Sequence, residues 1–474
     1  MILLKEASRA TGTSRTRLLI ISFEGRMSTC ATKMAAPPGA MPGTSDAPAR
    51  HKRGTTMTFR ILSLDGGGTW ALIQVKALQK LYGAEARGLD VLARFDLVAA
   101  NSGGAIVLGG LLAGMTLGEL LALFESRKTR RAIFHDVDDI ADPVREAEKL
   151  LGIGARFSTK AKLKAIRNVL GPLGDVTLDA LQAAIPGTPL PRILIPAFDY
   201  DLHRATLFRS DLASLSTGGQ SDSAPTLADA IHASSTAPVH YFDAPATVVY
   251  GKPPQKRRFW DGAIGGYDNP VLAAVIEACG NATRYQSPLD ALQILSIGTG
   301  GTHLPLAGGH PAQWPVLVAR QQKPGAIRDA ELIATSILDD PPDAATFDTY
   351  VLLGQSLVRA EARKAMRNSR FVRMNPMLQP SLDHTTQTWV LTGSDAGPVL
   401  TQKEFKWLLK RDLAALAQRD VERIGKLCES WFAGNIANQP IIANADLECV
   451  LGHATFADAL HAWEGLCGEK AVGG

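Results

Sequence analysis

Short apolar runs alternate with segments of helical periodicity from residue 58 onwards, and this alternation constrains the fold more than any other feature. Phe59–Leu64 has the length and composition of a buried strand. The glycine turn Asp65–Thr69 follows it, and an apolar helical face then runs from Leu72 to Leu81. Strands that lead repeatedly into helices are typical of a parallel sheet covered by helices. The sequence therefore predicts an α/β protein.

Later parts of the chain repeat this alternation. Further strands are expected at 95–100, 192–198, 205–208, 258–260 and 291–297, and helices at 103–113, 117–126, 159–170, 227–233 and 270–278. We expect the strand at 291–297 to close the sheet. The C-terminal third is predicted to be largely helical, and the apolar residues between Phe405 and Trp431 predict one long amphipathic helix.

Residues 1–57 differ from the rest in composition. Residues 1–56 contain nine Lys or Arg and three Asp or Glu, a balance of +6, although the whole chain carries only +4. Met57 directly precedes the first strand. We expect 1–57 to be a disordered leader or the product of a start codon assigned too far upstream, with a transit peptide as a less favoured alternative. A core would span 58–301, and a mostly helical part, 302–474, would pack on it.

Composition excludes several classes of protein. Hydrophobic residues make up 46% and charged residues 20%, the balance of a soluble globular protein. A net charge of +4 is too small for a dedicated nucleic-acid binder. Five scattered cysteines without a C-x-x-C pair indicate no disulfide framework or zinc site, and they fit a reducing compartment. We expect a cytoplasmic protein, able to bind peripherally at a membrane, that uses no metal or cofactor.

Three short stretches carry residues suited to chemistry. Gly66–Gly68 presents backbone N–H groups between a strand and a helix, which can hold negative charge or simply form a tight turn. Neither a P-loop nor a dinucleotide fingerprint follows it. Ser102 lies on a second strand–turn–helix among small residues, the pattern of a nucleophile elbow, although it can also cap the helix. Asp261 ends a strand before Gly262, as a turn residue or as a carboxylate at the edge of the sheet.

Together these stretches resemble the patatin-like phospholipase family. Its members have an Asp-Gly-Gly-Gly oxyanion loop after the first strand, a serine elbow, and an Asp-Gly-Gly or Asp-Gly-Ala motif with the second catalytic residue. Asp65–Gly68, Ser102 and Asp261–Ala263 occur in that order. Supporting matches lie at 233–238, 269–270, 295–300 and 371–376. The resemblance covers about residues 58–301 with one patch near 371. It implies a three-layer α/β/α fold with a mostly parallel sheet and a helical C-terminal extension.

The resemblance also implies an activity. A serine-dependent lipid acyl hydrolase, similar to phospholipase A, would cleave fatty-acyl esters of phospholipids or other acyl-ester lipids, with transient contact with a membrane surface and no nucleic-acid partner. Ser102 would be the nucleophile and Asp261 the base of a Ser–Asp dyad that forms an acyl-enzyme. Gly66, Gly67 and Gly68 would form the oxyanion hole.

Departures from the family pattern keep alternatives open. Trp70 and Ala71 stand where the family commonly has Arg and Gly, and Ala100 replaces the first glycine of the elbow. The alternatives are an esterase, thioesterase or acyltransferase acting on non-membrane substrates, and a catalytically silent lipid-binding member. His232 and His240 allow a less favoured Ser–His–Asp triad. The basic residues between 359 and 373 form either a lipid-headgroup site or a solvated helix face.

Overall fold

The computed structural model describes most of the chain from residue 58 onwards. The described residues are 58–137, 155–211, 224–238, 241–251, 253–320, 323–325, 329, 336, 340–356, 366, 368–391, 400–438 and 451–468. The predictions for the leader, for His240 and for most of the basic stretch fall outside these residues. Within the described ranges, no helix has both the length and the apolarity needed to cross a membrane.

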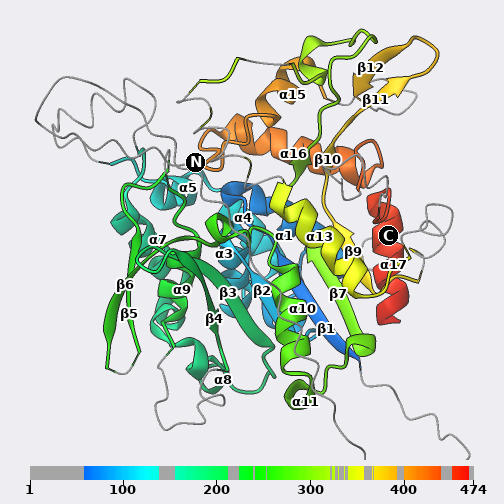
Figure 1. Ribbon diagram of the computed structural model, residues 1–474. Coiled ribbons are helices and arrows are strands. Elements are labelled where there is room, and N and C mark those ends of the chain that lie inside the picture. Colours follow the sequence, from blue (N-terminus) through cyan, green and yellow to red (C-terminus); the bar gives the residue numbers. More distant parts are fainter. Residues whose placement is uncertain are drawn as a thin grey trace, which may run out of the picture. The chain divides into compact units, whose positions relative to one another are not determined.

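Eight strands form the central sheet, in the order β5-β6-β3-β2-β1-β7-β9 with β4 paired to β3 (Figure 1). Each neighbouring pair in the series β3-β2-β1-β7-β9 is parallel. By contrast, β4 and β6 run antiparallel to β3. The sheet is therefore mostly parallel, as expected. Its strands are β1 (Phe59–Leu64), β2 (Leu97–Ala100), β3 (Arg192–Asp199), β4 (Arg204–Arg209), β5 (Ala246–Tyr250), β6 (Gln255–Asp261), β7 (Leu292–Ile297) and β9 (Phe371–Met374).

Helices cover both faces of this sheet, because its strands are apolar on both sides. In β1, Ile61 belongs to one apolar cluster with residues of α10, and Leu62 belongs to another with residues of α1 and α3. This arrangement confirms the three-layer α/β/α fold. The helices are α1 (Leu72–Tyr82), α2 (Gly88–Leu92), α3 (Ser102–Leu112), α4 (Leu117–Glu125), α5 (Arg127–Ile133), α7 (Thr159–Leu170), α8 (Leu181–Ala184), α9 (Leu227–Ser234), α10 (Val271–Gly280), α11 (Ala282–Tyr285), α13 (Asp340–Leu352), α15 (Gln402–Leu408), α16 (Gln418–Phe432) and α17 (Phe456–Cys467).

The C-terminal part contributes strands as well as helices. The sheet does not end at 291–297, because β9 pairs in parallel with β7 and buries Phe371 and Val372 completely. Shorter strands also occur in this part of the chain. They are β8 (Gly301–Thr302), which pairs with β10 (Met377–Leu378), and β11 (Pro380–Asp383), which forms a hairpin with β12 (Thr388–Leu391). The central sheet therefore extends beyond residue 301.

The prediction of one long helix from Phe405 to Trp431 is wrong. α15 and α16 are separated by residues 409–417, which we call the connecting strap. Within the strap, Arg411 and Ala415 have φ angles of 42° and 38°, which a right-handed helix does not allow. The apolar spacing continues through the strap because it is also buried, so periodicity alone did not reveal the break.

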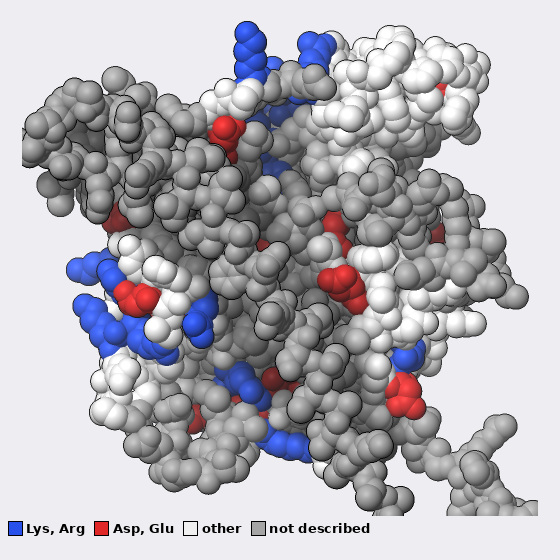
Figure 2. Space-filling view, viewed as in Figure 1, with Lys and Arg blue, Asp and Glu red and all other residues white. Residues whose placement is uncertain are grey.

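Charged side chains of both signs share the face of the molecule shown in Figure 2. Lys and Arg gather there in several separate groups, and Asp and Glu side chains lie between them. This mixture fits the small net charge of +4.

Candidate active site

Ser102 is the first residue of α3 and lies in the strained turn by which β2 leads into that helix. Its φ angle of 48° is unfavourable for a residue with a Cβ atom, as expected for a nucleophile elbow. The two residues that follow must be small. A Cβ atom on Gly103 would lie 2.6 Å from the Gly68 carbonyl oxygen, and one on Gly104 would lie 2.5 Å from the Leu64 oxygen. The elbow is thus packed directly against the end of β1 and the glycine loop.

Asp261 reaches Ser102 because β3 is longer than β2. β3 continues beyond the end of β2, and β6 pairs with this overhang in the antiparallel direction, with Asp261 opposite Ala197. β6, whose last residue is Asp261, therefore ends beside the Ser102 elbow. Gly262 permits this approach, since a Cβ atom there would lie 2.4 Å from Asn101 Oδ1 and 2.8 Å from the Pro196 oxygen.

The Asp261 carboxylate accepts several hydrogen bonds. Its Oδ1 atom accepts from Asn101 Nδ2 at 3.1 Å and from the Ala263 backbone N–H at 3.0 Å, and the Ser102 side chain is a further partner. Burial raises the pKa of Asp261, and these hydrogen bonds only partly oppose the increase. A carboxylate with a raised pKa that contacts a serine hydroxyl is equipped to accept its proton.

The three glycines of the loop are placed differently from one another. Gly66 donates its N–H to the Asp268 carbonyl oxygen at 2.8 Å, so this donor is already used. Gly68 begins a 3-10 helix (Gly68–Ala71), and Gly103 lies in the first turn of α3. N–H groups at these positions have no partner within their own helix. Gly68 and Gly103 both line a cavity with Ser102, which is where an oxyanion would form.

The cavity beside Ser102 has mainly apolar walls. This partly open pocket lies between α3, α5 and α7, and Ser235, Ala237, Tyr241 and Phe242 also line it. A second cavity of about 250 Å³ shares Gly68, Ile106, Ile133 and Phe134 with it and extends past Leu123 and Phe124. Hydrocarbon chains are favourably buried in such surroundings.

His232 is placed poorly for a triad. It is buried on α9, and its Nδ1 atom makes no hydrogen bond with the described residues. Burial, followed by the nearby charges of Lys162 and Arg167, holds the pKa of His232 well below its ordinary value. The carboxylate of Asp261, by contrast, is a direct partner of the Ser102 side chain.

Trp70 anchors the glycine loop to the connecting strap. Its indole Nε1–H donates to the Asp412 oxygen at 3.0 Å, and its ring stacks on Trp407 with centroids 5.8 Å apart. Thr69 adds hydrogen bonds from its N–H to the Leu413 oxygen and from its hydroxyl to the Ala414 oxygen, both 2.8 Å long. The residue that departs from the family pattern therefore has a definite packing role.

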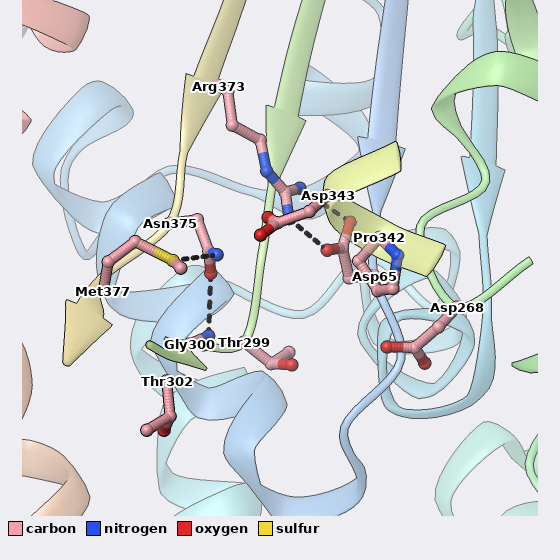
Figure 3. A pocket seen from close by; sticks show the side chains of 11 residues that line it. Asp65, Asp268, Thr299, Gly300, Thr302, Pro342, Asp343, Arg373, Asn375 and Met377 are labelled. Atoms are coloured by element: carbon pink, nitrogen blue, oxygen red, sulfur yellow. Dashed lines mark hydrogen bonds and ion pairs between the residues drawn. The ribbon is translucent and has the colours of Figure 1, made fainter. Parts of the chain in front are cut away.

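A buried ion pair holds the other side of the loop. Figure 3 shows Arg373 on β9 pointing toward Asp65, the residue that starts the loop. Arg373 donates through both terminal nitrogens to the Asp65 carboxylate, and its Nη1 also donates to Ser296 Oγ at 2.7 Å. The pair lines a separate cavity of about 310 Å³ that Asp268 and Asp343 also border. Among the residues that the structure describes, no cluster of three or more metal-ligating side chains occurs.

Sequence reasoning missed several residues around Ser102 and Asp261. Asn101 and Ser234 lie in the recognised motifs, but nothing indicated that their side chains bond to the site. Gly103 follows the serine, so the elbow pattern could have identified its N–H. Lys162 gave no signal, because it lies on an amphipathic helix between Lys160 and Lys164.

Comparison with known proteins agrees with this geometry. Residues 62–275 match the model of the patatin-like phospholipase family. This part of the chain belongs to the patatin-like phospholipase family. The match includes Ser102 and Asp261, and the family supports lipid acyl hydrolase activity in general terms.

Similarity to other known proteins is too weak to support a functional argument. A crystal structure of VipD from Legionella pneumophila aligns with a TM-score of 0.31 and 12% identity, covering 86% of this chain and 75% of VipD. No curated protein sequence matches the chain.

Proposed function

We propose that the patatin-like domain cleaves fatty-acyl esters of phospholipids or related lipids through a Ser102–Asp261 dyad. The observation that carries this proposal is the contact between the Ser102 side chain and the buried Asp261 carboxylate, at a strained elbow that opens into an apolar cavity. Membership of the patatin-like family supports the choice of lipid substrates.

The dyad carries out two acyl transfers. Ser102 Oγ attacks the ester carbonyl carbon as its proton passes to Asp261, and the carbonyl oxygen becomes an oxyanion. The intermediate then collapses, and the leaving alcohol takes the proton from Asp261. In the second transfer Asp261 accepts a proton from water, which attacks the acyl-enzyme. Collapse of that intermediate returns the proton to Ser102 and releases the fatty acid.

Backbone N–H groups stabilise both tetrahedral intermediates. The proposed donors are Gly68 and Gly103, which line the pocket together with Ser102, and Gly67 is adjacent in the loop. We do not assign Gly66 this role, because its N–H donates to Asp268. Each well-placed donor contributes about 3 kcal/mol to transition-state stabilisation in hydrolases.

The apolar cavities would hold the acyl chain. Each buried methylene contributes about 0.8 kcal/mol, and the two neighbouring pockets beside Ser102 have Ile106, Ile133, Phe134 and Leu123 in their walls. A long-chain acyl ester therefore fits this site better than a small polar ester. The enzyme would contact a membrane surface transiently when it takes a phospholipid from a bilayer.

Labelling with a fluorophosphonate tests the nucleophile, and vesicle hydrolysis tests the substrate class. The wild-type protein should be labelled at Ser102, whereas Ser102→Ala should lose both labelling and ester hydrolysis with little change in thermal midpoint. Labelling at Ser235, which lines the same cavity, would overturn the assignment. Turnover of soluble short-chain esters without hydrolysis of phosphatidylcholine vesicles would favour the soluble esterase. A folded protein that neither reacts nor turns over would be a silent member.

A further inference from the structure

A completely buried lysine reaches the cavity of Ser102 from α7. Lys162 Nζ donates to the His232 backbone oxygen at 3.1 Å, to Ser235 Oγ at 3.3 Å and to Thr236 Oγ1 at 2.6 Å. It also lies 4.2 Å from the centre of the Phe242 ring. The three ammonium hydrogens are therefore all directed to neutral oxygens.

Such a lysine is costly for the protein. Within the described residues, Lys162 has no carboxylate within ion-pair distance, and its side chain is inaccessible to solvent. Moving an ammonium group into the interior without a paired charge costs several kcal/mol. Burial accordingly holds the pKa of Lys162 well below its ordinary value. A methionine would fill the same space without this penalty, so the charge or its hydrogen bonds must serve another purpose.

The turn that Lys162 binds contacts both members of the proposed dyad. Ser234 Oγ accepts a hydrogen bond from the Ser102 N–H at 3.0 Å and donates to Asn101 Oδ1 at 3.0 Å. Two residues later, the Thr236 oxygen accepts from the Asp261 N–H at 2.8 Å. Movement of the turn would therefore displace the nucleophile and the base relative to each other.

We propose that Lys162 is a positioning residue for Ser102 and Asp261: its three hydrogen bonds hold the Ser234–Thr236 turn that lies between them. This inference rests on the proposed dyad. Burial is the main cause of the raised pKa of Asp261, and the charge of Lys162 lowers that pKa less than the hydrogen bonds from Ala263, Ser102 and Asn101 do. In return, Asp261 favours the protonated form of Lys162.

Lys162 does not act as a ligand for substrate phosphate, because its three donors are already used. The other titratable groups around the turn are neutral or directed elsewhere. Burial lowers the pKa of His232 on α9 and raises that of Tyr241, so both are uncharged near pH 7. Asp243 accepts the N–H of Thr159, and Arg167 pairs with Asp175 and Asp229.

The test compares Lys162→Met with two controls in the full-length chain. Lys162→Arg keeps the charge, and Lys164→Met removes an exposed charge from the same helix. The rate of fluorophosphonate labelling at Ser102 and the kinetics of ester hydrolysis are measured between pH 4 and 9. In Lys162→Met we expect the acid limb of both profiles to move to higher pH, because the charge of Lys162 that lowers the pKa of Asp261 is removed. We also expect kcat to fall by about tenfold to a hundredfold with little change in KM. Lys162→Arg should keep the wild-type acid limb, and Lys164→Met should behave as the wild type.

A folded Lys162→Met protein with the acid limb of the wild-type pH profile and the wild-type labelling rate would overturn the positioning role. If Ser102 is still labelled in that protein, the proposed function stands. If Lys162→Met does not fold, Thr236→Val provides the second test, because it removes the shortest Lys162 hydrogen bond and keeps the charge. Slower labelling of this folded variant would support the role, and an unchanged rate would overturn it. Failure of the wild type to label at Ser102 would refute the proposed function itself.

Discussion

Removal of the Arg373 guanidinium should both destabilise the protein and disturb its glycine loop. Arg373 and Asp65 are almost completely buried, and the two terminal guanidinium nitrogens bind the two carboxylate oxygens. In Arg373→Met the Asp65 carboxylate would lose this partner in the interior, and Ser296 Oγ would lose a donor as well. Because Asp65 begins the loop that carries Gly68, the damage should reach the site.

The size of the effect follows from burial. Removing one partner of a buried pair costs about 3–5 kcal/mol. An exposed pair provides the matched control: Arg258 and Asp201 also bond through two oxygens, but their side chains are 48% and 44% exposed. Arg258→Met should therefore destabilise the protein far less than Arg373→Met, because solvent screens the exposed pair. The double variant Asp65→Asn/Arg373→Met should be more stable than Arg373→Met, because it leaves no unpaired buried charge.

Urea unfolding gives the free energies, and fluorophosphonate labelling reports on the loop. We expect Arg373→Met to unfold at a clearly lower urea concentration than Arg258→Met and to label Ser102 more slowly. Equal losses of stability in the two variants would refute the reasoning about burial. Lost stability with an unchanged labelling rate would show that the pair does not position the loop.

Four further predictions follow from the site and the leader. Asp261→Asn should lower turnover by roughly three orders of magnitude while His232→Ala retains most of it, and a folded but inactive His232→Ala would refute the dyad. Asp261 can act as a base only when it is ionised, and burial raises its pKa. We therefore expect the pH profile of kcat/KM to show activity being lost, as the pH falls, at a value above the ordinary aspartate pKa of about 3.9. Trp70→Phe keeps the stack on Trp407 but loses the bond to Asp412, so unfolding in urea should reveal a cost of about 1 kcal/mol. Deletion of residues 1–56 should leave specific activity and the thermal midpoint unchanged, and a large loss of either would show that the leader packs on the core.

Features that depend on residues adjacent in the chain could be predicted from the sequence. The apolar run at Phe59–Leu64 identified β1 with its correct ends, and small residues identified the elbow at Ser102. The glycines of these turns are required by close backbone contacts, and such local steric requirements leave a readable pattern. The order of the three motifs was sufficient to identify the family and its three-layer fold.

Contacts between residues far apart in the chain depend on how the whole protein packs. Asn101 bonds to Asp261 across 160 residues because β6 pairs with the overhang of β3, and strand register is set by the whole sheet. Arg373 reaches Asp65 across 308 residues because β9 joins the sheet next to β7. Periodicity could not predict the break between α15 and α16 for a related reason. The connecting strap buries apolar side chains at a spacing typical of a helix, but carbonyl oxygens of Asp412, Leu413 and Ala414 accept hydrogen bonds from Thr69 and Trp70 rather than from a helical turn. Apolar periodicity indicates which side chains are buried. The hydrogen-bond or ion-pair partner of a backbone or charged group depends instead on how the whole chain packs.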